Sequence, residues 1–63
     1  RDSREAARGL TVGDRVIVAW RGRDEEAVLT EVRRSRVKAM LDLGGVHHEI
    51  DRRADEVRLV DHK

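Results

Sequence analysis

Apolar and polar residues alternate in short runs along most of the chain, and this period of two is the feature that most constrains the fold. Successive side chains of a β-strand point to opposite faces of a sheet, so each run predicts a strand with one buried and one solvated face. Charged stretches and the Gly44–Gly45 pair separate the runs. The sequence therefore predicts five short strands, joined as a meander, over segments 12–20, 26–32, 36–43, 46–50 and 56–60.

The position of each turn predicts how neighbouring strands pair. We expect the first hairpin to be centred on Arg23, the second between Arg34 and Ser35, and the third on the two glycines, which suit the positive φ angles of a tight turn. This pairing places alternating charges in one outward row, formed by Arg15, Glu31, Lys38 and Asp51. The opposite face is the predicted core, which consists of Val16, Val18, Trp20, Val28, Val32, Val37, Ala39, Leu41, Val46, His48 and Ile50, closed by Val57 and Leu59.

The chain has 63 residues, which is enough for one small domain with a thin core. We divide it into an N-terminal arm (1–10), a folded domain (11–61) and a tail (62–63). In the arm, Asp2 or Ser3 as N-cap and Gly9 as C-terminal stop indicate a helix of at most two turns. A helix of that length is not stable without packing against something else, so the arm is either helical and packed or disordered.

Charge and composition limit the location and the partners of the protein. Fourteen basic residues against 13 acidic ones give a net charge of +1, so any basic site must be local. The chain has no cysteine, and no apolar run reaches the roughly 20 residues that a membrane span needs. We therefore expect a cytoplasmic protein without membrane contact. It begins with Arg1 and not with Met, as an excerpt from a longer protein would.

The segment Gly13-Asp14-Arg15-Val16-Ile17-Val18, followed after a charged loop by Ala27-Val28-Leu29-Thr30-Glu31-Val32, resembles the opening of KOW- and Tudor-type SH3-like barrels. The resemblance covers residues 12–60 and implies an all-β fold, a five-stranded SH3-like barrel with a short N-terminal helical or disordered arm. Glu26 stands where a KOW motif has a glycine, so the resemblance extends to the fold class and to no family within it. Many bacterial domains of this fold bind RNA or DNA, or dock onto nucleic-acid machinery, and the resemblance implies such a partner here.

His47, His48 and Glu49 form the cluster that most suggests chemistry. Neighbouring residues on a strand point to opposite faces, so the two histidines do not bind one metal ion, and His47 with Glu49 supplies too few ligands for a closed zinc site. The two serines have no visible base to activate them. Along the predicted rows the carboxylates lie beside basic residues, which indicates charge compensation at the surface and not paired acid–base catalysis. We therefore expect no metal, no cofactor and no catalytic residue, and hence no enzyme.

Arginines gather at one end of the predicted barrel. In an antiparallel meander the second-to-third and fourth-to-fifth connections lie at the same end, and the first strand starts there. Guanidinium groups bind phosphate in a forked geometry. We therefore predict a non-catalytic binding module that contacts nucleic-acid backbone through Arg15, Arg33, Arg34, Arg36, Arg52 and Arg53.

A second surface feature supports an alternative function. The same strand pairing places Ile17, Leu29 and Met40 in a continuous outward apolar row across three strands, and aligned exposed apolar residues often mark a contact. Either the N-terminal arm, with Leu10, covers this row, or a second subunit or a host protein does. The alternative prediction is therefore a protein–protein interaction or oligomerisation module that uses this row, with a homo-oligomer as one form.

Overall fold

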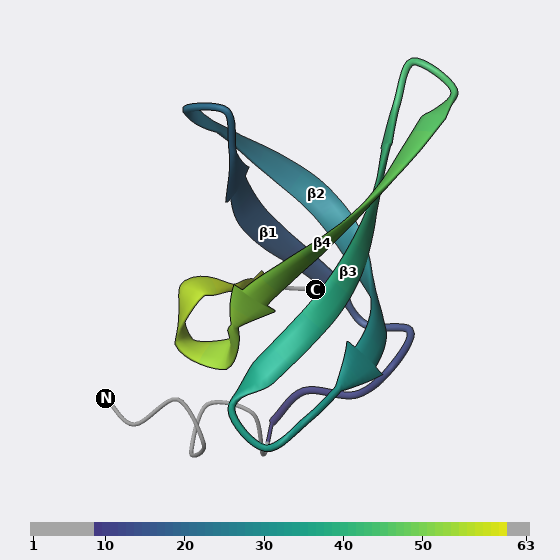
Figure 1. Ribbon diagram of the computed structural model, residues 1–63. Helices are drawn as coiled ribbons and strands as arrows, with labels where there is room; N and C mark the ends of the chain where they lie inside the picture. The colour runs from purple at the N-terminus through teal and green to yellow at the C-terminus, as the bar shows by residue number, and fades with distance from the viewer. Residues whose placement is uncertain (1–8, 61–63) are drawn as a thin grey trace.

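The computed structural model describes residues 9–60, which form one antiparallel sheet of five strands (Figure 1). The elements are β1 (Arg15–Trp20), β2 (Arg23–Val32), β3 (Arg36–Leu43), β4 (Val46–Arg53), the 3-10 helix η1 (Ala54–Glu56) and β5 (Arg58–Leu59). The predicted five-stranded, all-β architecture is confirmed. The helix predicted in the arm and the tail at 62–63 lie outside the described residues.

The strand order across the sheet is β4-β3-β2-β1-β5, so β4 and β5 form its two edges. These edge strands do not pair with each other, and the sheet is therefore not closed into the predicted barrel. The β1–β2 and β3–β4 hairpins diverge toward their tips, as the upper half of Figure 1 shows. The opposite end of the sheet, where the β2–β3 loop and η1 lie, carries the site described below.

The core lies on one face of the sheet and is built mainly from small aliphatic side chains. Its buried members are Val16, Val18, Ala27, Leu29, Val37, Ala39, Leu41, Ile50, Ala54 and Val57. Leu10, Trp20, Val32 and Leu43 are partly buried against them. Burial of each Val or Leu stabilises the fold by about 1.5–3 kcal/mol, so a core of this size leaves little margin.

The third hairpin turns at Gly44 and Gly45, as predicted. Both glycines have positive φ angles, 60° and 84°, which a two-residue turn that matches the twist of its strands requires. The turn pairs Asp42 with His47, and farther along the strands it pairs Lys38 with Asp51. The predicted register of β3 against β4 is confirmed over its whole length.

The first hairpin is where the predicted register is wrong. The turn consists of Arg21 and Gly22, with φ angles of 51° and 78°, so Trp20 pairs with Arg23 and Arg15 pairs with Val28. The expected centre at Arg23 treated the start of β2 as a loop. The β2 residue that pairs with a given residue of β1 is therefore three positions away from the predicted one. Because three is an odd number, each residue of this part of β2 lies on the face opposite to the predicted face.

The reversal exchanges two neighbouring side chains. Leu29, predicted to face outward, is 1% exposed in the core, whereas Val28, predicted to be in the core, is 41% exposed. Val46 and Leu59 were also predicted in the core and are exposed, because one borders the projecting β3–β4 turn and the other lies on a two-residue edge strand.

A β-bulge restores the predicted pairing in the second half of β2. Leu29 pairs with Ala39 and Glu31 pairs with Lys38, so Thr30 is the extra residue between them. The charge row therefore runs through Glu31, Lys38 and Asp51 as expected, and only Arg15 is absent from it.

Candidate functional site

Three arginines lie in one row across the end of the sheet. Arg36 on β3 is directly opposite Arg53 on β4, and the backbone N–H of Arg33 donates to the carbonyl of Arg36 at 2.8 Å. The Nε of Arg33 also donates to Glu31, which keeps its guanidinium on the outer face. We call Arg33, Arg36 and Arg53 the arginine row.

The spacing within the row is short because of where Arg36 and Arg53 fall in the ladder. In an antiparallel pair, hydrogen-bonded and non-hydrogen-bonded positions alternate, and the pair that closes a tight turn, here Leu43 with Val46, is hydrogen-bonded. Counting from that pair places Arg36 and Arg53 at a non-hydrogen-bonded position, where facing side chains are closest. Two positive charges are therefore held side by side at the end of the sheet.

Each arginine of the row has a carboxylate beside it. Arg36 Nε lies 2.9 Å from Asp51 Oδ1, Arg53 Nη2 lies 3.2 Å from Asp55 Oδ2, and Arg33 pairs with Glu31. The hydrogen bond from Arg33 lowers the pKa of the Glu31 carboxyl, with a smaller contribution from the nearby charges of Arg33 and Lys38. The same hydrogen bond raises the pKa of Arg33. The row is thus a set of guanidiniums that are each matched locally by one acidic group.

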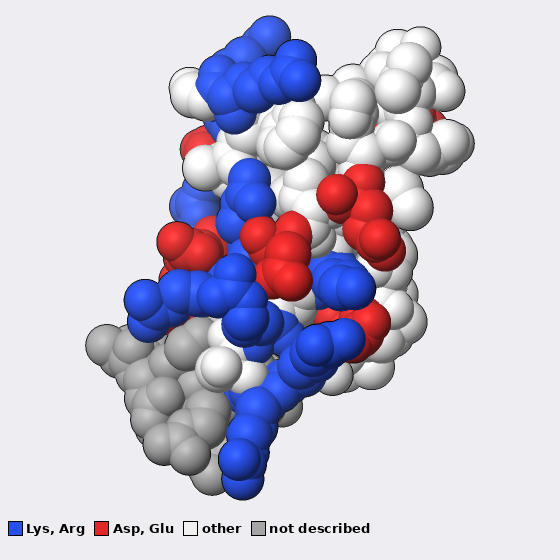
Figure 2. Space-filling view, viewed as in Figure 1, with Lys and Arg blue, Asp and Glu red and all other residues white. Residues whose placement is uncertain are grey.

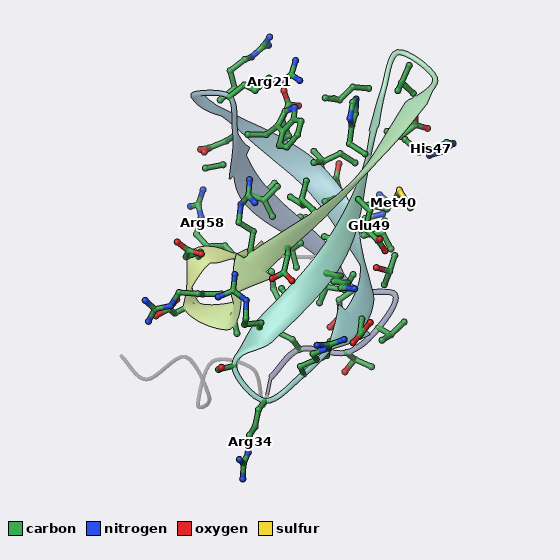
Figure 3. The ribbon with its side chains drawn as sticks, in the orientation of Figure 1. Arg21, Arg34, Met40, His47, Glu49 and Arg58 are labelled. Carbon is green, nitrogen blue, oxygen red and sulfur yellow. The ribbon has the colours of Figure 1, made fainter. Side chains whose placement is uncertain are left out.

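Arg34 extends the row into solvent from the β2–β3 loop. Its side chain is exposed and points away from the sheet at the lower end of the molecule (Figure 3). Within residues 9–60 it has no ion-pair or hydrogen-bond partner. It is therefore a cation that is available for an external anion without first breaking a contact.

Lys38 is a further cation beside the row that the sequence placed only in the charge ladder. It lies two residues after Arg36 on the same face of β3, and its Nζ is 4.0 Å from Glu31 Oε1. The i, i+2 spacing from Arg36 is the signal that adds it to the site. Figure 2 shows basic side chains crossing the lower half of this face, with acidic side chains between them.

Arg52 and Arg15 do not belong to this group, although both were predicted to. Arg52 pairs with the core residue Val37, so its side chain starts on the inner face, where it donates to the carbonyl of Asp51 at 2.9 Å and to that of Ala19 at 3.1 Å. The bond to Ala19 links β4 to β1 across the open side of the sheet. Arg15 lies on the outer face of β1, with its Nη1 3.7 Å from Glu26 Oε2.

The predicted apolar row is only partly present. Ile17 and Met40 are half-buried on the outer face, but Leu29 belongs to the core and Val28 takes its place beside Met40. Leu10 packs against the core. The exposed apolar surface is therefore centred on Val28 and Met40.

The histidines lie on opposite faces of β4, as the alternation predicted. His47 is exposed and pairs with Asp42, whereas the ring of His48 lies 5.4 Å from that of Trp20. Arg21 lies over the Trp20 ring, with its guanidinium carbon 5.1 Å from the ring centre. Among residues 9–60, no three His, Cys, Asp or Glu side chains are placed to hold a metal ion. In the same part of the chain, no helix has the length and apolar character needed to cross a bilayer.

Known proteins provide no assignment for this arrangement. Comparison with protein-family models, with curated protein sequences and with solved structures finds no match to the chain. The arginine row, Arg34 and Lys38 are therefore interpreted from their geometry and charge alone.

Proposed function

We propose that this domain is a non-catalytic binding module that contacts nucleic-acid backbone through the arginine row and Arg34. The observation that carries the proposal is the direct opposition of Arg36 and Arg53 in the β3–β4 register. Like charges directly opposite each other on a sheet destabilise it, and an anion between them removes that cost. A phosphate group, which accepts forked hydrogen bonds from arginine, is the anion best suited to the position.

The carboxylates beside the row do not prevent such binding. In the pair of Arg36 with Asp51, the two side chains are 54% and 50% exposed, and ion pairs of this kind contribute only about 0–1 kcal/mol. A phosphate that contacts two guanidiniums therefore replaces a carboxylate at little cost. The carboxylates keep the row neutralised when no ligand is bound.

The dimensions of the row fit a short stretch of backbone. Adjacent strands are about 4.8 Å apart, so three strands span roughly 10 Å. Phosphates along one strand of B-DNA advance by about 3.4 Å each, which makes the row about three nucleotides long. With Arg34 included, we expect about four phosphate contacts.

The mechanism is electrostatic and makes little use of base identity. The chain contains no Asn and no Gln, the side chains that read adenine edges, and its single aromatic residue, Trp20, is already in contact with His48 and Arg21. The order of the strands, with η1 between β4 and β5, supports assigning the domain to the SH3-like class, which supplies many nucleic-acid-binding modules. We assign no catalytic role to any residue.

Fluorescence anisotropy with labelled single-stranded and duplex oligonucleotides tests the proposal. Four phosphate contacts predict that affinity falls by roughly 50-fold for single strands, and about 150-fold for duplex, between 50 and 200 mM salt. Absence of binding at 50 mM salt would rule out the proposed function.

A further inference from the structure

A second surface feature lies on the outer face, where β2 and β3 separate. The β2–β3 ladder ends at the pair of Val28 and Met40, although β2 continues back to Arg23 and β3 continues on to Leu43. The two hairpins diverge from this point, as Figure 1 shows. Between them lies a depression of about 370 Å³.

The depression has an apolar floor and an acidic rim. Val28, which is 41% exposed, and Met40 form the floor. Glu25, Glu26 and Asp42 contribute three carboxylates. Arg15 lies 3.7 Å from Glu26 and Arg23 lies 3.8 Å from Glu25, so Asp42 is the carboxylate that leaves the depression with a negative charge.

Unpaired backbone groups border the depression on both sides. In the β1–β2 hairpin the closing pair is Trp20 with Arg23, so alternation directs the backbone N–H and C=O of Glu26 away from β1 and toward β3. In the β3–β4 hairpin the closing pair is Leu43 with Val46, so the same groups of the neighbouring Asp42 point away from β4 and toward β2. In the described part of the chain, neither residue belongs to the β2–β3 ladder.

We propose that this depression is a docking site for an extended basic segment of a partner protein. The segment adds as a short strand, with its backbone hydrogen-bonded to Glu26 and Asp42. One apolar side chain lies on Val28 and Met40, and its Lys or Arg side chains pair with the carboxylates of the rim. This site is on a different part of the sheet from the arginine row and does not depend on the proposed nucleic-acid contact.

The charges on the sheet favour a basic partner over a second copy of this chain. The longer open edge that a second copy would offer is β4, whose outer face presents Glu49 and Asp51. Those carboxylates would meet the carboxylates of the rim, and like charges at facing positions are destabilising. A segment with a cation two residues before and two residues after its apolar residue has the complementary pattern.

The test uses the labelled peptide SKSVSKS as the probe and SESVSES as its acidic counterpart, measured by fluorescence anisotropy; in both, the charged residues lie two positions from the valine and therefore on the same face of a strand. We expect the basic peptide to bind and the acidic one not to bind. Asp42→Lys should weaken binding of the basic peptide by about tenfold, because it reverses a charge at the rim. Asp24→Lys is the matched control, since Asp24 is an exposed aspartate of β2 that does not line the depression, and it should change affinity less than about twofold.

Met40→Ala distinguishes docking in the depression from general electrostatic attraction, because it removes part of the apolar floor without changing the charge. It should weaken binding of the basic peptide by about fivefold. Equal effects of Asp42→Lys and Asp24→Lys, or no effect of Met40→Ala, would overturn the proposal, as would failure of the basic peptide to bind. Light scattering that shows concentration-dependent dimers blocked by Asp42→Lys would identify a second copy as the occupant and also overturn it. Oligonucleotide binding should not weaken in Asp42→Lys, so the two proposals fail independently.

Discussion

Arg36 on β3 and Arg53 on β4 lie directly opposite one another, at a position of the ladder where facing side chains are closest. Each guanidinium is bound by its own carboxylate, Asp51 for Arg36 and Asp55 for Arg53. The pair is therefore neutralised one charge at a time by exposed groups, which a multivalent anion can replace.

Removal of the carboxylate beside Arg33 should strengthen oligonucleotide binding. Glu31→Gln frees the Arg33 guanidinium and removes one negative charge next to the row, so we expect a two- to threefold gain in affinity at 50 mM salt. Glu26→Gln removes the same charge near Arg15, outside the row, and serves as the control. Equal gains in both variants would mean that only net charge matters.

The pH dependence of Glu31 provides a separate check of its contact with Arg33. The hydrogen bond from Arg33 lowers the pKa of Glu31 in the folded state. A lowered folded pKa contributes stability that is present above the unfolded value, about 4.3, and is lost as the pH falls through the folded value. In Arg33→Gln, NMR titration should show the Glu31 pKa raised relative to the wild type, because the hydrogen bond from Arg33 is lost. An unchanged Glu31 pKa in that variant would contradict the contact.

The faces of β2 predict losses of stability of different size for two neighbouring truncations. Leu29→Ala should lower the free energy of unfolding by about 2–5 kcal/mol, since Leu29 is fully buried. Val28→Ala should lower it by less than about 1 kcal/mol, because Val28 is on the outer face. Urea denaturation measures both. The reverse order would restore the register predicted from the sequence.

These two residues also illustrate what the sequence could and could not predict. The third hairpin was predicted correctly because Gly44 and Gly45 together mark a two-residue turn. The first was misplaced because Arg21, which is not glycine, takes the positive φ angle at its turn, and the charged residues that follow resemble a loop. The bulge at Thr30 has no local marker, so the exchange of Val28 and Leu29 was not visible in the alternation alone.

The candidate site was predictable to a similar extent. The connectivity of a meander brings the segments of Arg33, Arg34, Arg36 and Arg53 to one end, as the sequence predicts. The sequence also predicts Arg52 there, because the charged segment 51–55 resembles a turn. Alternation from Ile50 places Arg52 on the core face, and β4 continues through Arg53. The predicted strand 46–50 ends three residues before β4 does, and the position of Arg52 on the inner face is therefore not predicted.

Arg52 and Arg34 should therefore differ in what they contribute. Arg52→Met removes charge-assisted hydrogen bonds to the carbonyls of Asp51 and Ala19 and should lower the free energy of unfolding by about 1.5–3 kcal/mol. Arg34→Met should leave stability within about 0.5 kcal/mol and weaken oligonucleotide binding instead. Thermal denaturation and anisotropy on both variants check the assignment. A stability loss in Arg34→Met as large as that in Arg52→Met would refute it.

The most direct measurement is the dependence of single-stranded oligonucleotide affinity on salt in two double variants. Arg36→Gln with Arg53→Gln removes two members of the arginine row. Arg21→Gln with Arg23→Gln removes two arginines at the β1–β2 turn, and Arg21 lies at the opposite end of the molecule from Arg34 (Figure 3).

If the row holds phosphates, the slope of log affinity against log salt falls by about 1.4 in magnitude in the first variant and is unchanged in the second. An unchanged slope in the first variant, or an equal fall in both, would contradict the proposal that the arginine row binds nucleic-acid backbone.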